Sequence, residues 1–568
     1  MKKQVLAIAL VALAAIACNK KEEDTTPLAV DFEISANPCF AKDEVTFTAK
    51  VSGGQTPYTY EWKVGDAVTL EGETASWTPE ENGTFIVRLN VSDAKGKTGE
   101  RAKNLVVNPA EVVATGEVTL LWTAPLQGYT SMTTPAVADD GSIYTVTRDA
   151  NKLYKIDKDG KKVWEQTVIE SPQDGSQILG TPSIDTDGTI YIAGGSKNGD
   201  AVLAAFKPDG SLKWRFKDFW AAAGATLSPS INGITAGIGD NNVYIGNCGT
   251  TGTIISVAKA DGSRVNHMMD SDGKGPSGGA RAGILITKDG YACWSGGAYG
   301  IFGVPTSVLD TKGDGANWSW RGCYSKQSGW PDGNNSATLA AITVNGKNAL
   351  VGMQSLKADA DLGKEARTKV YAIEVATGEE IANVEIDACA KQDQGGIAIT
   401  EEGYVIATLK YNLGQADGGI ALVDVAQQKM VAHYGVMENV SAAPAIDAAG
   451  NILFATETGN FYMVKYNGSE FETLVKVNIA DLVGNDSRYA EAYAGLVAME
   501  DGERVGKAKI WSGIVIGDDG TIYVQFTDNN DRTIGGLAAI KVDYTTGPST
   551  VSPWPMMGQN RKHTNRQK

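Results

Sequence analysis

Two copies of one pattern decide the fold: Thr134-Pro135-Ala136-Val137 with Asp140-Gly141-Ser142-Ile143-Tyr144, and Thr181-Pro182-Ser183-Ile184 with Asp187-Gly188-Thr189-Ile190-Tyr191. A further pair keeps the same register, because Asp159-Gly160 and Asp209-Gly210 precede Trp164 and Trp214 by the same distance. The period is about 47 residues, and a repeat of this length is typical of a solenoid, a propeller or another repeat array. The repeat is therefore a stronger indication of the fold than any local motif.

Weaker copies of the pattern continue to the end of the chain. They begin at or near Ser228, Ala282, Ala340, Gly395, Ala443 and Ser512, so the chain has eight repeat starts. A repeat that holds four short strands cannot bury its own faces, whereas stacking the repeats around a ring buries them and leaves only short edges. We therefore predict an all-β fold in which residues 117–547 form an eight-bladed β-propeller, followed by a C-terminal tail at residues 548–568.

The turns and tryptophans of the repeats have expected structural roles. The Asp-Gly pairs predict hairpin turns, because glycine accepts the positive φ that such turns require. Trp122, Trp164 and Trp214 are expected to wedge between neighbouring blades and to cover the glycine-bearing turns. The last repeat supplies three strands, and residues 117–122 precede the first repeat without a blade of their own. We predict that this segment completes the eighth blade and so closes the ring.

A different pattern occupies residues 28–109. Val45–Val51 and Thr84–Val91 alternate between apolar and polar residues, as half-buried strands do. About eighty residues with six or seven such strands suit a two-sheet sandwich. Trp62 lies in the middle of one strand, so we expect it in the core of the sandwich rather than on a binding surface.

The N-terminus predicts export and lipid anchoring. Lys2 and Lys3 precede an apolar run that ends at Cys18, and this run is too short to span a bilayer. Residues 1–17 are therefore expected to be a signal peptide, and Cys18 the lipid-bearing first residue of the mature protein. Residues 18–27 lack the apolar side chains needed for packing and are expected to form a tether.

Several segments resemble known families. Residues 57–66 and 83–96 resemble a PKD domain, a spacer or adhesive module. The repeats resemble the pyrroloquinoline-quinone-type (quinoprotein-like) propeller, which includes the BamB-type subunit of outer-membrane assembly machinery. The tail, Pro553-Trp554-Pro555-Met556-Met557 through His563-Thr564, resembles a segment that often accompanies such repeats. Residues 19–27 resemble the acidic signal that sends Bacteroidetes-type lipoproteins to the outer face of the outer membrane.

The quinoprotein resemblance implies a set of catalytic features that we do not find in this chain. Dehydrogenases of this fold use an aspartate base, a calcium ion held by Glu and Asn, and a tryptophan beneath the quinone. The matching ligand positions cannot be placed here, and the chain has no adjacent cysteine pair and no Cys-x-x-Cys-His haem motif. The three histidines, His267, His433 and His563, have no spacing typical of a metal site or a catalytic triad. We therefore expect no cofactor, no metal and no catalytic residues.

Charge and cysteine content narrow the range of partners. The net charge of −16 disfavours nucleic acid, because phosphate binding needs a basic face. Besides Cys18 there are five cysteines, an odd number, so at least one stays free. They are Cys39, Cys248, Cys293, Cys323 and Cys389.

One stretch, residues 317–332, interrupts the repeat with four aromatic residues among small polar ones. Trp318 is expected to be another inter-blade tryptophan. Trp320, Arg321, Tyr324 and Trp330 remain as a candidate surface for stacking on sugar rings or gripping a peptide.

The sequence thus predicts a non-enzymatic lipoprotein on the cell surface that binds a glycan or a protein. The alternatives are a periplasm-facing scaffold of the BamB type and, with less support, a degenerate quinone-dependent dehydrogenase.

Overall fold

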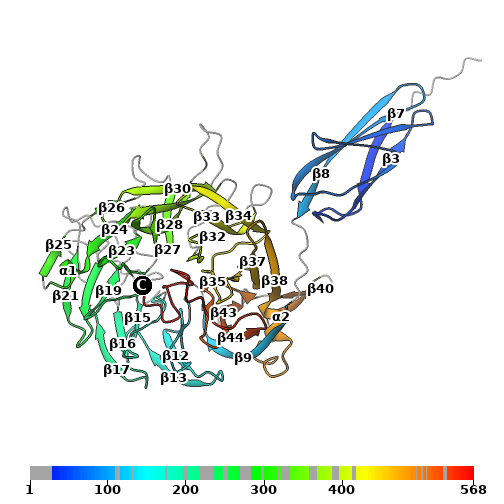
Figure 1. The fold of residues 1–568 in the computed structure, drawn as a ribbon. Coiled ribbons are helices and arrows are strands. Elements are labelled where there is room, and N and C mark those ends of the chain that lie inside the picture. The colour runs from blue at the N-terminus through cyan, green and yellow to red at the C-terminus, as the bar shows by residue number, and fades with distance from the viewer. Residues whose placement is uncertain are drawn as a thin grey trace, which may run out of the picture. The chain divides into compact units, whose positions relative to one another are not determined.

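The protein divides into two compact units at Glu111, each with its own sheets. The computed structural model describes residues 28–108, 116–130, 133–172, 176–178, 180–195, 202–217, 235–246, 254–268, 283–295, 300–311, 313–316, 320–322, 333–356, 358, 367–386, 396–411, 417–493, 496–500, 503–506, 508–528 and 534–568. The predicted signal peptide, Cys18 and the tether therefore lie outside the described residues. Both units are built almost wholly of strands (Figure 1).

The first unit is a two-sheet sandwich, as predicted. One sheet contains β1 (Ala29–Ile34), β3 (Val45–Ser52) and β6 (Thr74–Trp77). The other contains, in spatial order, β2 (Cys39–Phe40), β8 (Thr98–Asn108), β7 (Gly83–Ser92), β4 (Thr59–Val64) and β5 (Val68–Glu71).

Trp62 lies in the core of this sandwich, which confirms the prediction made for it. Its side chain is fully buried, and its ring centre lies 5.1 Å from that of Phe32 and 5.6 Å from that of Phe47. Its indole nitrogen donates to the carbonyl oxygen of Gly72 at 2.9 Å, so the one polar atom of the ring is satisfied.

The second unit is a ring of antiparallel sheets around a common centre (Figure 1). Each sheet runs outward from an inner strand, which is short in most of them. The first four sheets contain β10 (Ala136–Val137), β11 (Ile143–Thr147), β12 (Lys152–Ile156) and β13 (Lys162–Thr167); β14 (Ser183–Ile184), β15 (Ile190–Gly194), β16 (Val202–Phe206) and β17 (Leu212–Phe216); β18 (Gly237–Ile238), β19 (Asn242–Gly246), β20 (Ile254–Ala258) and β21 (Arg264–Met268); and β22 (Leu285–Ile286), β23 (Tyr291–Ser295), β24 (Ile301–Pro305) and β26 (Trp320–Gly322).

The short helix α1 (Thr306–Leu309) follows β24, and β25 (Gly313–Ala316) then pairs with β21 in parallel. The next three sheets contain β27 (Gly333–Val344), β28 (Lys347–Leu356), β29 (Arg367–Glu374) and β30 (Glu380–Ile386); β31 (Ile397–Ile399), β32 (Val405–Leu409), β33 (Gly418–Asp424) and β34 (Lys429–Val436); and β35 (Ala445–Ile446), β36 (Ile452–Ala455), β37 (Asn460–Tyr466) and β38 (Phe471–Asn478).

The last sheet of the ring joins the two ends of the propeller. Helix α2 (Ile479–Gly484) and the hairpin of β39 (Val497–Glu500) and β40 (Glu503–Gly506) precede it. The sheet contains β41 (Ala508–Lys509), β42 (Val515–Ile516), β43 (Ile522–Asp528), β44 (Ile534–Val542) and β9 (Val118–Gln127). Strand β9 pairs with β44 from Val118 opposite Val542 to Gln127 opposite Ile534. This is the closure predicted from residues 117–122, extended by five residues.

Buried uncharged polar groups reinforce this closure. Gln525 is fully buried; its amide nitrogen donates to the Thr133 hydroxyl and to the Val146 carbonyl oxygen, both at 3.1 Å. Its amide oxygen accepts a hydrogen bond from the hydroxyl of Thr145 at 3.0 Å. The eighth sheet is thus joined to the first by hydrogen bonds as well as by apolar packing. Satisfied buried amides of this kind define one arrangement of the surrounding chain.

The three repeat tryptophans lie over turns of the next sheet. Each indole nitrogen donates to a carbonyl oxygen in such a turn: Trp122 to Lys158 at 2.8 Å, Trp164 to Pro208 at 3.1 Å and Trp214 to Lys259 at 3.0 Å. Each ring also covers the glycine of that turn, at positive φ in all three cases: Gly160, Gly210 and Gly262. A Cβ atom on Gly160 would lie 2.6 Å from the Trp122 ring, so this position requires glycine.

One repeat start was placed wrongly. The pattern at Ser228–Ile231, predicted as the third start, lies outside the described residues, whereas the inner strand of the third sheet is β18 (Gly237–Ile238). Tyr244 on β19 aligns with Tyr144 and Tyr191, and this aromatic residue marks the register of the repeat better than the Pro-Ser-Ile triplet at 229–231 does.

Candidate functional site at the hub of the propeller

The hub of the propeller is occupied by the chain's own C-terminal segment, residues 548–568, which we call the hub tail (Figure 1). Backbone N–H groups of the inner strands donate to carbonyl oxygens of this segment. In six of the sheets described, the donor is an equivalent residue near the end of the inner strand: Val137 to Arg561, Ile184 to Lys562, Ile238 to Thr564, Ile286 to Asn565, Ile399 to Trp554 and Ile446 to Pro555. The hub tail thereby satisfies edges that would otherwise stay unpaired.

Apolar and neutral side chains anchor the hub tail. Trp554 and Met556 are fully buried against the inner strands. His563 is also fully buried, and its Nδ1 lies 3.2 Å from the carbonyl oxygen of Pro182. Burial lowers the pKa of His563 to about 4, so the ring is neutral at neutral pH.

Ion pairs join the hub tail to the turns that follow the inner strands. Arg561 contacts Asp139 at 2.8 Å and Asp518 at 2.5 Å, and so links the first and eighth sheets. Lys562 pairs with Asp139 at 2.5 Å, and the pKa of Asp139 is lowered chiefly by this hydrogen bond. Arg561 lowers the pKa of Asp518 in the same way. These carboxylates are therefore held in their charged form.

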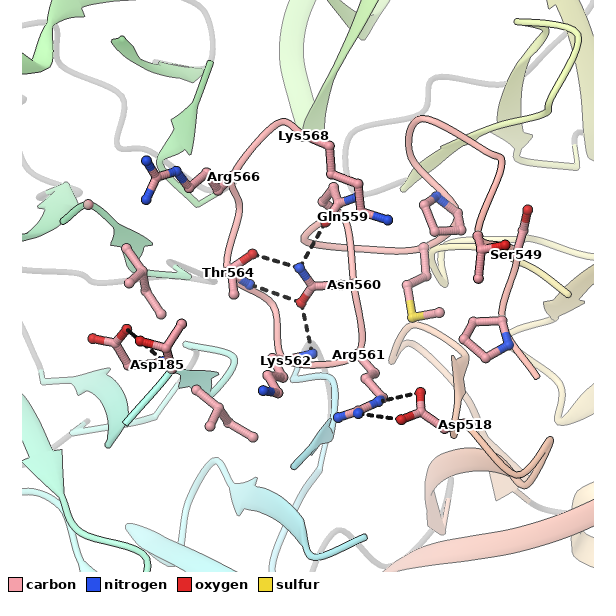
Figure 2. A pocket seen from close by; sticks show the side chains of 18 of the residues that line it. Asp185, Asp518, Ser549, Gln559, Asn560, Arg561, Lys562, Thr564, Arg566 and Lys568 are labelled. Atoms are coloured by element: carbon pink, nitrogen blue, oxygen red, sulfur yellow. Dashed lines mark hydrogen bonds and ion pairs between the residues drawn. The ribbon is translucent and has the colours of Figure 1, made fainter. Parts of the chain in front are cut away.

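A cavity of about 600 Å³ lies between the hub tail and the second and third sheets (Figure 2). The sheets contribute Ile184–Thr186, Ile238–Asp240 and Lys259, and the remaining walls come mostly from the hub tail. The volume falls in the range of ordinary small-molecule sites. The hub is therefore a candidate site with the dimensions of a small-molecule pocket.

The candidate residues of the aromatic stretch lie away from the hub. Trp320 and Arg321 belong to β26, the outermost strand of the fourth sheet, where they pair with Gly303 and Phe302. This segment therefore supplies the fourth strand of the sheet, although the sequence suggested only an interruption of the repeat. Their side chains, together with Trp318, Tyr324 and Trp330, are outside the described residues.

Two of the five cysteines after Cys18 lie among the described residues. Cys39 and Cys293 are buried and free, while Cys248, Cys323 and Cys389 are not among the described residues. In the described residues, no three His, Cys, Asp or Glu side chains are grouped so that they could hold a metal ion. Neither described helix is long and apolar enough to cross a membrane.

Sequence reasoning treated residues 548–568 as an appended tail and missed its place in the hub. The composition of this segment indicated that it packs against the rest of the chain. The segment has four basic residues, no acidic one, and buried-type residues such as Trp554, in a chain where acids outnumber bases by 67 to 51. A basic segment in so acidic a protein indicates that it is held against the protein's own carboxylates.

The sandwich, the closed ring and the filled hub place this protein among the two-domain, all-β proteins with a quinoprotein-like propeller. Residues 26–107 match the PKD domain, and residues 109–382 match the family model described as outer membrane protein assembly factor BamB. A PKD domain is thus followed by a BamB-type repeat region over residues 109–382.

Solved structures share the propeller fold at low sequence identity. A europium-containing methanol dehydrogenase is 14% identical, with 74% of this chain and 93% of that chain covered and a TM-score of 0.52. BamB from Moraxella catarrhalis is 13% identical, with 74% of this chain and 100% of that chain covered and a TM-score of 0.47. No curated protein matches the chain significantly.

Proposed function

We propose that this protein is a non-catalytic lipoprotein of the outer membrane, displayed on the cell surface, whose propeller binds a glycan or a protein. The observation that carries the proposal is the construction of the hub. The chain's own tail is hydrogen-bonded to six inner strands of the described sheets, which makes the ring a rigid platform for recognition. The lipidated Cys18 and the tether at residues 18–27 would hold this platform at the membrane.

A quinone-dependent dehydrogenase is a poorer fit to the described residues. One solved structure with the same propeller fold is a methanol dehydrogenase. The quinoprotein resemblance implies a quinone with a calcium ion held by Glu and Asn. Among the residues that the structure describes, no cluster of carboxylates is arranged for such an ion. Trp122, Trp164 and Trp214 all cover turns, and Trp554 of the hub tail is buried against the inner strands. These residues do not fit the group, and we derive no reaction from it.

The family match favours a second candidate function. Because residues 109–382 match the BamB model, the protein could instead face the periplasm and act as a scaffold for other outer-membrane proteins. The two candidates place the same propeller on opposite faces of one membrane, so its location distinguishes them.

The anchoring is tested by Cys18→Ala. We expect this variant to leave the membrane fraction, because the lipid is the proposed anchor. Cell fractionation with a high-salt wash measures this. If the variant still sediments with membranes, the anchor lies elsewhere. Protease treatment of intact cells then decides the face: cleavage of the unaltered chain supports surface display, and protection supports the periplasmic scaffold.

The aromatic stretch is tested by Trp320→Ala and Trp330→Ala in the soluble Cys18→Ala background. If the stretch binds ligand, both variants lose signal on a glycan array while their melting temperatures stay near that of the parent. Trp214→Ala is the matched control, because this buried ring covers Gly262 and its truncation should cost about 3–5 kcal/mol of stability. A large fall in melting temperature for both test variants would assign them to the core instead.

A further inference from the structure

The cavity at the hub is positively charged in an acidic protein. Its lining contains five basic side chains and three carboxylates, whereas the chain as a whole carries a net charge of −16. Four of the five basic residues belong to the hub tail: Arg561, Lys562, Arg566 and Lys568. An excess of positive charge in a concave site favours an anionic ligand.

The carboxylates neutralise most of these cations but not all of them. Lys259 pairs with Asp185 at 2.7 Å, and both side chains are largely buried. Arg566 pairs with Asp240 at 2.6 Å in a more exposed position. In the part of the chain that the structure describes, Lys568 has no ion pair. An ammonium group at the cavity is therefore available to a ligand.

A second, independent observation is an unsatisfied amide in the wall of the cavity. Gln559 lines the cavity and is only 1% exposed. Its Oε1 accepts a hydrogen bond from Asn560 at 2.8 Å, and Asn560 also donates to Thr564 (Figure 2). The Nε2 of Gln559 has no partner among the described residues. A buried donor left unpaired costs about 1–3 kcal/mol, which an acceptor oxygen on a ligand would recover.

The other polar groups of the lining limit the class of ligand. Asp240 and the hydroxyl-bearing Ser549 and Thr550 offer acceptors in the same lining. Such acceptors match hydroxyl groups rather than a second anionic group. Pro555 and Met556 add an apolar wall. A ligand that fits this lining carries one anionic group, several hydroxyls and a small apolar face.

We propose that the hub cavity binds a small acidic sugar, with its carboxylate or phosphate near Lys568 and an oxygen accepting from Nε2 of Gln559. The inference rests on the proposed binding role and names a ligand class and a second site, apart from the aromatic stretch. In this arrangement the hub tail both fills the centre of the ring and forms the binding surface.

The test is calorimetric titration of the full chain with glucuronate, glucose 6-phosphate, glucose and inorganic phosphate. Binding of one of the two acidic sugars is expected, with glucose and inorganic phosphate at least tenfold weaker. Gln559→Glu keeps the acceptor for Asn560 but replaces the free donor with a carboxylate oxygen, so it should abolish binding. Lys568 is exposed, so Lys568→Gln should weaken binding at least tenfold without altering the melting temperature.

Matched controls lie close by. Gln567 donates to Asn348 at 2.9 Å and does not line the cavity, so Gln567→Glu should bind as the parent does. Lys158→Gln removes an exposed charge on a distant turn and should have no effect. Inorganic phosphate binding as tightly as the sugars would show an adventitious ion only and overturn the proposal. Unaltered binding in Lys568→Gln, or no binding by the parent, would also overturn it, while a positive glycan array would leave the proposed function standing.

Discussion

The rim and the hub of the propeller both join the ends of the ring, but by different interactions. At the rim, β9 pairs with β44 through a backbone ladder, and uncharged groups such as Gln525 join the completed eighth sheet to the first. At the hub, the tail is held by backbone bonds, buried Trp554 and His563, and ion pairs of Arg561. The stability of the rim should therefore depend on an intact strand β9. The stability of the hub should depend on buried side chains and on ion pairs.

The largest expected effect comes from breaking the rim. Deleting residues 117–122 while keeping the PKD domain removes Leu120 and Trp122 from the core and leaves the end of β44 from Ala539 to Val542 unpaired. We expect a loss of many kcal/mol, a sharply lower melting temperature of the propeller and aggregation, because exposed strand edges pair between molecules.

Scanning calorimetry and light scattering measure these effects. The PKD domain serves as an internal control, because its own unfolding transition should not change. If the deletion variant melts like the parent, the hub alone holds the ring closed.

The next effect comes from the apolar anchor of the hub. Trp554→Ala should cost about 3–5 kcal/mol, because a fully buried ring is replaced by a cavity. The melting temperature of the propeller should fall by several degrees. Val551→Ala is the control in the same segment, since Val551 is 60% exposed and its truncation should be neutral. Equal melting of Trp554→Ala and Val551→Ala would mean that the hub tail contributes little to stability.

The smallest effect, and the sharpest contrast, is the response to pH. His563 has a pKa of about 4 in the folded protein and about 6.5 when unfolded, so below pH 6.5 the unfolded chain gains a proton that the folded chain does not. His563 therefore leaves the free energy of unfolding at its full value above pH 6.5, and this free energy decreases as the pH falls toward 4. The decrease amounts to about 3 kcal/mol when complete. Asp139 and Asp518, whose pKa values are lowered, add to the loss at still lower pH.

Melting temperatures at pH 7 and pH 4.5 test this account. His563→Asn should flatten the dependence on pH, whereas Val551→Ala, at an exposed and non-titrating position of the same segment, should keep the slope of the parent. The difference between the two variants isolates the hub, because the groups that bridge the rim at Gln525 do not titrate. An unchanged slope in His563→Asn would assign the acid sensitivity to the ion pairs of Arg561 instead.

Local repetition explains how much of the fold could be predicted. The Thr-Pro and Asp-Gly patterns, with Trp164 and Trp214 in register, predicted the propeller, because each copy carries its own strand and turn residues. The pairing of residues 117–122 with the last repeat also followed, since a lone strand and a blade short of one strand complete each other. The Pro-Ser-Ile triplet after Ser228 predicted the wrong start for the third repeat, because three residues are too few to define a register.

What the sequence by itself determined is therefore the class of each domain, the turns that need glycine and the way in which the ring closes. Tertiary structure alone decided that the hub tail fills the centre, and that Gln559 lines a cavity with an unpaired donor. The reason is physical. Strands and hairpins follow from neighbouring residues, whereas the hub gathers single residues from six or more sheets around a segment hundreds of positions away. No local pattern encodes such a meeting, because each inner strand contributes a backbone N–H group, which every residue except proline carries.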